Sequence, residues 1–253
     1  MTGSLEGRVA LITGTGGGVG REAALRFAAA GAVVVGCDTD QELNDETVAK
    51  VIDAGGVMTG KGSVDLADPA EAAAWVDEAV TAHGRIDVVY NNAAGVKFAP
   101  IETMSAEDWH FTIRNELDLV FFVTQAAWPH LAKQGGVIIN TGSVQGLIGR
   151  RSQPGIAHAA TKGAVVAMTR QFAAEGAPHG IRSVCISPGA IETPTTAPWF
   201  AVPEIRNAVL ESQLVNRIGQ PADVAELALF LASDAASFMS GSNIVLDGGV
   251  TSV

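Results

Sequence analysis

The stretch HAATK contains the side chains best suited to proton chemistry in this sequence. His158 stands four residues before Lys162, and Ser143 lies upstream in the segment INTGSVQG. An imidazole is mostly neutral at physiological pH and has one ring nitrogen free to accept a proton. A serine with a histidine also suggests a hydrolase, but TGSVQG lacks the G-x-S-x-G nucleophile elbow, so we exclude that activity. The stretch favours proton transfer by His158.

A glycine-rich turn, TGTGGGVG at residues 13–20, follows an apolar run and precedes a helical pattern. Glycines permit positive φ, let the backbone approach a pyrophosphate and leave the amides at a helix start pointing at the anion. The spacing G-x-G-x-x-G fails from Gly14 because Val19 occupies its last position; the glycines that fit are Gly14, Gly18 and Gly20. Alone this cluster is weak evidence, because any tight turn could use it.

Asp38 supplies a second, agreeing feature. It closes the next apolar run, about 20 residues after Gly18, where a carboxylate would accept hydrogen bonds from ribose hydroxyls and repel a 2′-phosphate. The alternative is that Asp38 caps the following helix, although Thr39 and Asp40 could also serve. With no Arg or Lys nearby in the sequence, we favour NAD over NADP.

Neither the remaining histidines nor the cysteines indicate a metal site. The histidines, which are His83, His110, His130 and His179, lack ligand spacing and a nearby Cys/Asp cluster. Cys37 and Cys185 lie in different apolar runs without CxxC spacing, so we interpret them as buried small hydrophobic residues.

Short apolar runs alternate with Ala-rich helical patterns along the chain. We expect strands at 8–13, 32–37, 56–63, 86–91, 136–141, 181–187 and 243–247, and helices at 19–30, 40–54, 69–83, 105–132, 159–176 and 221–233. This alternation predicts parallel β-α-β units with helices on both faces. The expected fold class is α/β, a three-layer Rossmann-type doubly wound parallel sheet of about seven strands, with a single domain over residues 1–253.

The least regular region is 188–215, where prolines interrupt any long element. An insertion this long between a strand and the next helix is more often functional than idle. We therefore expect a substrate lid at about 190–215.

Composition and charge exclude several classes of partner. Sixteen basic against 27 acidic residues give a net charge of −11, which repels nucleic-acid backbones and anionic membranes. The chain start, MTGSLEGRVALITG, lacks the features of a signal peptide, and no apolar run approaches the ~20 residues that span a bilayer. We expect a cytoplasmic protein that binds neither nucleic acid nor membrane.

Eight motifs, in this order, resemble the classical short-chain dehydrogenase/reductase family over nearly the whole chain. They are TGTGGGVG (13–20), VDLAD (64–68), NNAAG (91–95), RNELDLVF (114–121), INTGSVQG (139–146), HAATKGAV (158–165), ISPGAIETP (186–194) and SGSNIVLDGG (240–249). The resemblance implies a homotetramer and a dinucleotide. The residues expected to bind the dinucleotide are Gly14, Gly18, Val19, Gly20, Asp38, Asp65, Leu66, Asn91, Lys162, Pro188, Gly189, Ile191 and Thr193.

Within that set the resemblance implies distinct places. Asp65 and Leu66 would flank the adenine and Asn91 would line the ribose side. The segment from Pro188 to Thr193 would hold the nicotinamide carboxamide.

The family's active site is a tetrad of Asn, Ser, Tyr and Lys that acts on an alcohol or carbonyl. By the resemblance Asn115, Ser143 and Lys162 stand at three of these positions, and His158 stands where the tyrosine is expected. The only tyrosine, Tyr90, belongs to the fourth strand and is predicted to lie in the core.

His158 would move the proton to or from the substrate oxygen while hydride passes to or from the nicotinamide. Cationic neighbours would disfavour the imidazolium, which biases the enzyme toward alcohol oxidation. An imidazole is shorter than a phenol, and a misplacement of about 1 Å can cost about a hundredfold in rate. We expect an NAD-dependent oxidoreductase; the alternatives are a dehydratase or epimerase on this scaffold, or a catalytically silent dinucleotide-binding protein.

The substrate-facing segments are largely apolar. Their expected wall residues are Phe98, Pro100, Ile101, Leu147, Ile148, Trp199 and Phe200, which suit a hydrophobic secondary alcohol or its ketone. Lys97, Arg150 and Arg151 leave room for an acidic group, so a hydroxy acid stays open as a substrate.

Overall fold

Parallel strands form the centre of the computed structural model, which describes residues 3–150 and 153–253. Among these residues one seven-stranded sheet has the order β3-β2-β1-β4-β5-β6-β7, and all of its strand pairs are parallel. The strands are β1 (Val9–Thr13), β2 (Val33–Cys37), β3 (Val57–Lys61), β4 (Val88–Asn91), β5 (Gly136–Thr141), β6 (Ile181–Pro188) and β7 (Asn243–Leu246). Each lies within or overlaps a predicted strand, and the predicted fold class is confirmed.

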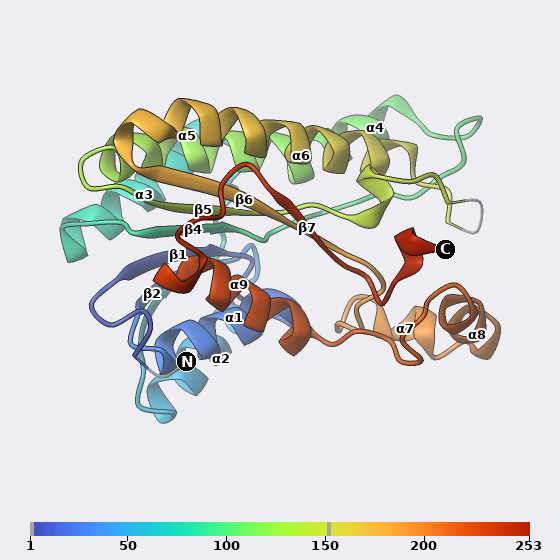
Figure 1. Ribbon diagram of the computed structural model, residues 1–253, viewed down its shortest axis with the longest axis horizontal. Helices are drawn as coiled ribbons and strands as arrows, with labels where there is room; N and C mark the ends of the chain where they lie inside the picture. Colours follow the sequence, from blue (N-terminus) through green and yellow to red (C-terminus); the bar gives the residue numbers. More distant parts are fainter. Residues whose placement is uncertain (1–2, 151–152) are drawn as a thin grey trace.

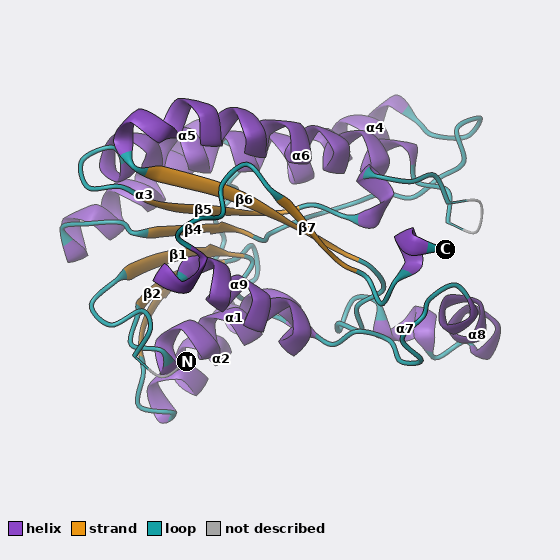
Figure 2. Cartoon of the chain, in the orientation of Figure 1, coloured by secondary structure: helices purple, strands orange, loops and turns teal. Residues whose placement is uncertain are grey.

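Helices cover both faces of the sheet (Figures 1 and 2). One face carries α1 (Gly18–Ala29), α2 (Gln41–Asp53) and α9 (Pro221–Ala232); the other carries α3 (Pro69–His83), α4 (Ala106–Ile113), α5 (Leu119–Leu131) and α6 (Ile156–Gly176). Local sequence sets their ends. The Asp68 side chain caps α3 by accepting from the amides of Ala70 and Glu71, and Gly84 ends it at φ 74°.

The core consists of two apolar layers separated by the sheet. Successive strand residues point to opposite faces, so Ile12 packs in the layer with α1 and α9 while Leu11 packs in the layer with α3 and α5. Tyr90 is fully buried in the first layer, as predicted. The central strands β1 and β4 are thus fully buried and mostly apolar, because both faces of the sheet are covered there.

Two regions depart from the regular pattern. The helix expected over 105–132 is divided by a π-helical turn, η1 (Arg114–Asp118), between α4 and α5. The irregular region after β6 contains two short helices, α7 (Ala197–Phe200) and α8 (Pro203–Glu211). Both departures border the cleft described next.

Candidate active site

A cleft of about 1470 Å³ opens at the carboxyl ends of the strands. Residues directly after β1, β2, β4, β5 and β6 line it, among them Gly14, Asp38, Asn92, Ser143 and Gly189. The sheet order reverses between β1 and β4, and such a switch point is where doubly wound sheets bind ligands.

The glycine turn brings α1 onto the edge of this cleft. Gly14 has φ 75° and Gly18 has φ 51°, both in the left-handed region that favours glycine. The first turn of α1 contains no acidic residue, and a Cβ at Gly17 would meet open space. Backbone amides and the positive end of the helix dipole are therefore available for an anion such as a pyrophosphate.

Gly20 has a packing role. It does not line the cleft, and a Cβ on it would overlap the Gly14 carbonyl oxygen and approach the Asn92 amide. Gly20 therefore allows α1 to lie against the end of β1.

Replacing Gly20 by alanine is expected to lower the free energy of unfolding by about 3 kcal/mol, because the added methyl group must displace backbone. Gly17→Ala is the matched control, since φ −174° suits alanine and its Cβ has space; its cost should be about 1 kcal/mol or less. Urea denaturation of both variants measures this. Equal losses would contradict the tight packing of Gly20.

Asp38 is not the cap of the following helix. Its Oδ2 accepts from the Gly16 amide at 2.8 Å, while the Asp40 side chain caps α2 by accepting from the Leu43 amide. Asp38 thus faces the glycine turn from the end of β2, as a ribose-binding carboxylate would. One cation near this site was not expected, because it is distant from Asp38 in the sequence. Arg21 also lines the cleft, and it donates to the Gly16 carbonyl at 2.6 Å.

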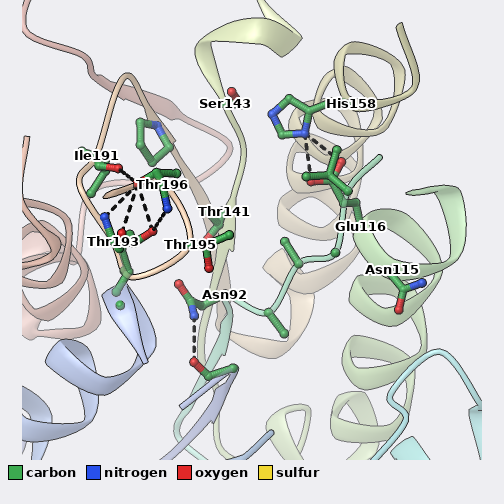
Figure 3. A pocket seen from close by; sticks show the side chains of 18 of the residues that line it. Asn92, Asn115, Glu116, Thr141, Ser143, His158, Ile191, Thr193, Thr195 and Thr196 are labelled. Carbon is green, nitrogen blue, oxygen red and sulfur yellow. Dashed lines mark hydrogen bonds and ion pairs between the residues drawn. The ribbon is translucent and has the colours of Figure 1, made fainter. Parts of the chain in front are cut away.

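Most of the other predicted cofactor residues line the same cleft. These are Val19, Asp65, Leu66, Lys162, Pro188, Gly189, Ile191 and Thr193. Asp65 forms an ion pair with Arg114 at 2.6 Å, and Thr193 lies against Gly18. The segment after β6 therefore lies beside the glycine turn (Figure 3).

Asn91 does not lie where we predicted. Its side chain is 1% exposed and donates to Asn140 Oδ1 at 2.8 Å and Thr124 Oγ1 at 3.1 Å, in the interior below the cleft. Its neighbour Asn92 lines the cleft instead. Successive strand residues point in opposite directions, so the side chain of Asn91 lies in the core and that of the next residue, Asn92, faces the cleft.

His158 lies in the first turn of α6 and borders the cleft. Its Nδ1 is 2.9 Å from both carboxylate oxygens of Glu116 (Figure 3). The Phe98 ring meets the imidazole edge-on, with ring centroids 5.5 Å apart. The ring is thus held between a carboxylate and an aromatic wall.

Lys162 and Ser143 complete the polar end of the cleft. The Lys162 ammonium is almost fully buried, donates to the Thr141 carbonyl at 3.0 Å and lies 3.7 Å from Glu116. Ser143 borders the cleft directly after β5, and its Oγ accepts from the Gln145 amide at 3.1 Å.

Asn115, the predicted tetrad residue, lines the cleft, but its side chain is turned toward its own helix. Its side chain donates to the Phe111 carbonyl of the preceding helical turn and points away from His158 (Figure 3). Glu116, the next residue, contacts both His158 and Lys162 instead. Both lie in the π-turn η1, a type of helix defect that is frequent at functional sites.

Glu116 is ionised in this setting. Burial would raise the pKa of its carboxyl, but the charge of Lys162 and the hydrogen bonds from His158 and Thr161 together outweigh burial and lower it. The anion beside His158 offsets the Lys162 ammonium. The expected bias toward oxidation considered only cationic neighbours, and it stays a prediction.

The predicted apolar wall is present in part. Phe98, Trp199 and Phe200 line the cleft, and Phe98 and Trp199 meet edge-on with centroids 5.8 Å apart. Ile101 and Ile148 border a separate small pocket, and Pro100 and Leu147 line neither of these two pockets. Arg150 lines the cleft and lies 3.5 Å from Ser212 Oγ, whereas Arg151 falls outside the described residues.

Within residues 3–150 and 153–253, no helix has the length and apolar character to cross a membrane. The same residues contain no group of three or more His, Cys, Asp or Glu side chains arranged to hold a metal ion. Cys37 and Cys185 are buried free thiols, and burial raises the pKa of both.

Comparison with known proteins identifies the family. The family profile described as enoyl-(acyl carrier protein) reductase matches residues 14–251. A 3-oxoacyl-[acyl-carrier-protein] reductase of Thermotoga maritima is 39% identical over 251 residues, which cover 97% of this chain and 98% of the relative. A cyclohexanol dehydrogenase of an Acinetobacter species is 36% identical over 255 residues, which cover 100% of this chain and 98% of the relative.

Solved structures agree with these matches. The crystal structure of gox2181 superposes with a TM-score of 0.96 at 32% identity, covering 98% of this chain and 97% of that one. The fold and the matched sequences agree over nearly the full length. The chain belongs to the short-chain dehydrogenase/reductase family of oxidoreductases.

Proposed function

We propose that this protein interconverts a hydrophobic secondary alcohol and its ketone with NAD(H), and that His158 is its acid/base. One observation supports this above the others. The imidazole, fixed on Glu116 and next to Lys162, borders the same cleft as the glycine turn and Asp38. A proton-transferring group and a dinucleotide cradle thus share one continuous space.

The cofactor would lie across the carboxyl ends of the strands. The amides at the start of α1 would face its pyrophosphate, Asp38 its adenosine ribose, and the segment 188–193 its nicotinamide end. NAD supplies hydride transfer when it is bound. The protein supplies position, exclusion of water and the proton.

The proton would move through His158. During oxidation the imidazole Nε2 would take up the O–H proton of the alcohol, and the bound cofactor would supply the acceptor for the hydride. Ser143 would donate a hydrogen bond to the substrate oxygen. Reduction uses the reverse path, with an imidazolium that the Glu116 carboxylate stabilises.

The substrate class follows from the aromatic wall. Phe98 meets the imidazole edge-on and Trp199 meets Phe98, and these rings favour an apolar ring or chain beside a side chain shorter than the tyrosine that the resemblance predicts. The cyclohexanol dehydrogenase relative supports this class. Residues 190–215, with α7 and α8, would close over the substrate as a lid.

The homotetramer and the cytoplasmic location stay predictions.

NADH formation measured at 340 nm tests the proposal. The panel contains cyclohexanol, 1-phenylethanol, an aliphatic secondary alcohol and a 2-hydroxy acid, each with NAD⁺ and with NADP⁺. We expect the apolar secondary alcohols with NAD⁺ to give the highest kcat/KM. Absence of cofactor reduction with every alcohol, together with absence of NADH oxidation by the matching ketones, would contradict the proposal and favour the dehydratase, epimerase or silent alternatives.

A further inference from the structure

Glu116 is a buried carboxylate for which the family resemblance gives no role. Its side chain is 1% exposed, and its three polar side-chain partners among the described residues come from one helix, α6. Thr161 Oγ1 donates to it at 2.6 Å, His158 Nδ1 lies at 2.9 Å and Lys162 Nζ lies at 3.7 Å. A buried charge is expensive unless it is paired and hydrogen-bonded, so this arrangement needs a reason.

The contact with His158 is the more specific of the two contacts that Glu116 makes with a nitrogen atom. Both carboxylate oxygens are 2.9 Å from Nδ1, whereas Lys162 is farther from Glu116 and makes its shorter contact, 3.0 Å, with the Thr141 carbonyl. Glu116 is therefore more than a counter-ion for the lysine. Its geometry is directed at one nitrogen of the imidazole.

The π-turn makes this contact possible. Glu116 lies in the middle of η1, between α4 and α5, and its side chain crosses to the first turns of α6. Phe98 closes another side of the imidazole. Within residues 3–150 and 153–253 no hydrogen-bond partner of Nε2 is present, so this second ring nitrogen is available to the cleft.

We infer that Glu116 is a positioning residue for His158. Its carboxylate accepts the Nδ1 proton, holds the neutral imidazole in the Nδ1-protonated tautomer and leaves Nε2 as the proton-accepting atom. It also stabilises the imidazolium formed when Nε2 takes a proton, as carboxylates do for histidines in other enzymes. The catalytic consequence rests on the proposed function, but the tautomer does not.

The tautomer is measured without any substrate. In ¹⁵N-histidine-labelled protein above neutral pH, with His158→Gln used to assign the resonances, we expect His158 Nδ1 at the shift of a protonated ring nitrogen. Its Nε2 should appear at the far-downfield shift of an unprotonated one. An Nε2-protonated tautomer in the wild-type protein would overturn the inference even if the enzyme oxidises alcohols.

Kinetics then test the consequence. Glu116→Gln keeps the size but removes the charge, and we expect kcat to fall about 10²-fold with little change in the KM for NAD. Asp118→Asn is the matched control, because it makes the same chemical change in the same π-turn, and its kcat should stay near wild type. Glu116→Asp keeps a charge for Lys162 and should retain the Nδ1-protonated tautomer with an intermediate kcat.

These outcomes separate the two proposals. If the wild-type protein turns over no alcohol but shows the Nδ1-protonated tautomer, the proposed function fails and the positioning role stands. If Glu116→Gln, folded by circular dichroism, lowers kcat no more than Asp118→Asn does, the positioning role fails while the function stands. If Glu116→Gln does not fold, the wild-type tautomer and Glu116→Asp still decide.

Discussion

Replacing His158 by glutamine is expected to lower kcat for alcohol oxidation by about 10²–10⁴-fold, the usual contribution of a general acid or base. Glutamine keeps a polar side chain against Glu116 and Phe98 but cannot take up a proton at neutral pH. The KM for NAD should change little, because His158 contacts Glu116 and Phe98, whereas Asp38 contacts the glycine turn. Initial rates at saturating NAD⁺ with the best alcohol of the panel measure the loss.

The control for this variant is His179→Gln. His179 is an exposed residue after the C-terminal end of α6, while His158 lies in its first turn. Its substitution should leave kcat and KM at wild-type values. A His158→Gln enzyme with wild-type kcat would mean that another group, with Ser143 and Lys162 the nearest candidates, carries the proton. A loss confined to KM would indicate that His158 only binds substrate.

The fold was predictable because most strands are short apolar runs and several helix starts carry their own signal. In α3, for example, Asp68 and Pro69 mark the first turn and Gly84 marks the end. Those signals are local, and the sheet order follows from alternating strand and helix. The two short helices in the expected lid, α7 and α8, carry weaker sequence signals. The sequence pattern predicts only irregular backbone there.

The site was less predictable, and at two places an adjacent residue makes the contacts that were not expected. Asn91 and Asn92 are adjacent and identical in type, so only the strand register decides which one faces the cleft. Asn115 has the expected residue type, whereas its neighbour Glu116 contacts His158 and Lys162. A signal for Glu116 existed in the helical spacing, since 116, 120, 123 and 127 lie on one buried face of the helix.

The contact between Glu116 and His158 could not be read from either segment alone. They are separated by 42 residues, and their approach depends on a π-turn that no propensity predicts. The same holds for Arg21, which returns to the glycine turn to donate to Gly16 and pairs with Glu46. Tertiary packing creates these contacts, so the sequence alone indicates His158 but does not indicate its partner Glu116.

Replacing Asp38 by asparagine is expected to lower the ratio of kcat/KM with NAD to kcat/KM with NADP by about 10²-fold. The amide can still accept from Gly16, so the glycine turn keeps its support at β2. What disappears is the charge that would strengthen hydrogen bonds to the ribose hydroxyls and repel a 2′-phosphate. A charge-assisted hydrogen bond contributes about 1.5–3 kcal/mol, and about 1.4 kcal/mol corresponds to a factor of ten.

Arg21 is a cation that lines the same cleft as Asp38. Its guanidinium is held by the Gly16 and Leu43 carbonyls, the Thr47 hydroxyl and Glu46, so in the wild-type protein it is already bound at the glycine turn.

Asp65→Asn is the control for Asp38→Asn, because it removes the same charge from the same cleft at a side chain already paired with Arg114. That variant should keep the wild-type preference. If both variants shift the ratio equally, the preference reflects the overall charge of the cleft, and Asp38 has no specific contact with the ribose.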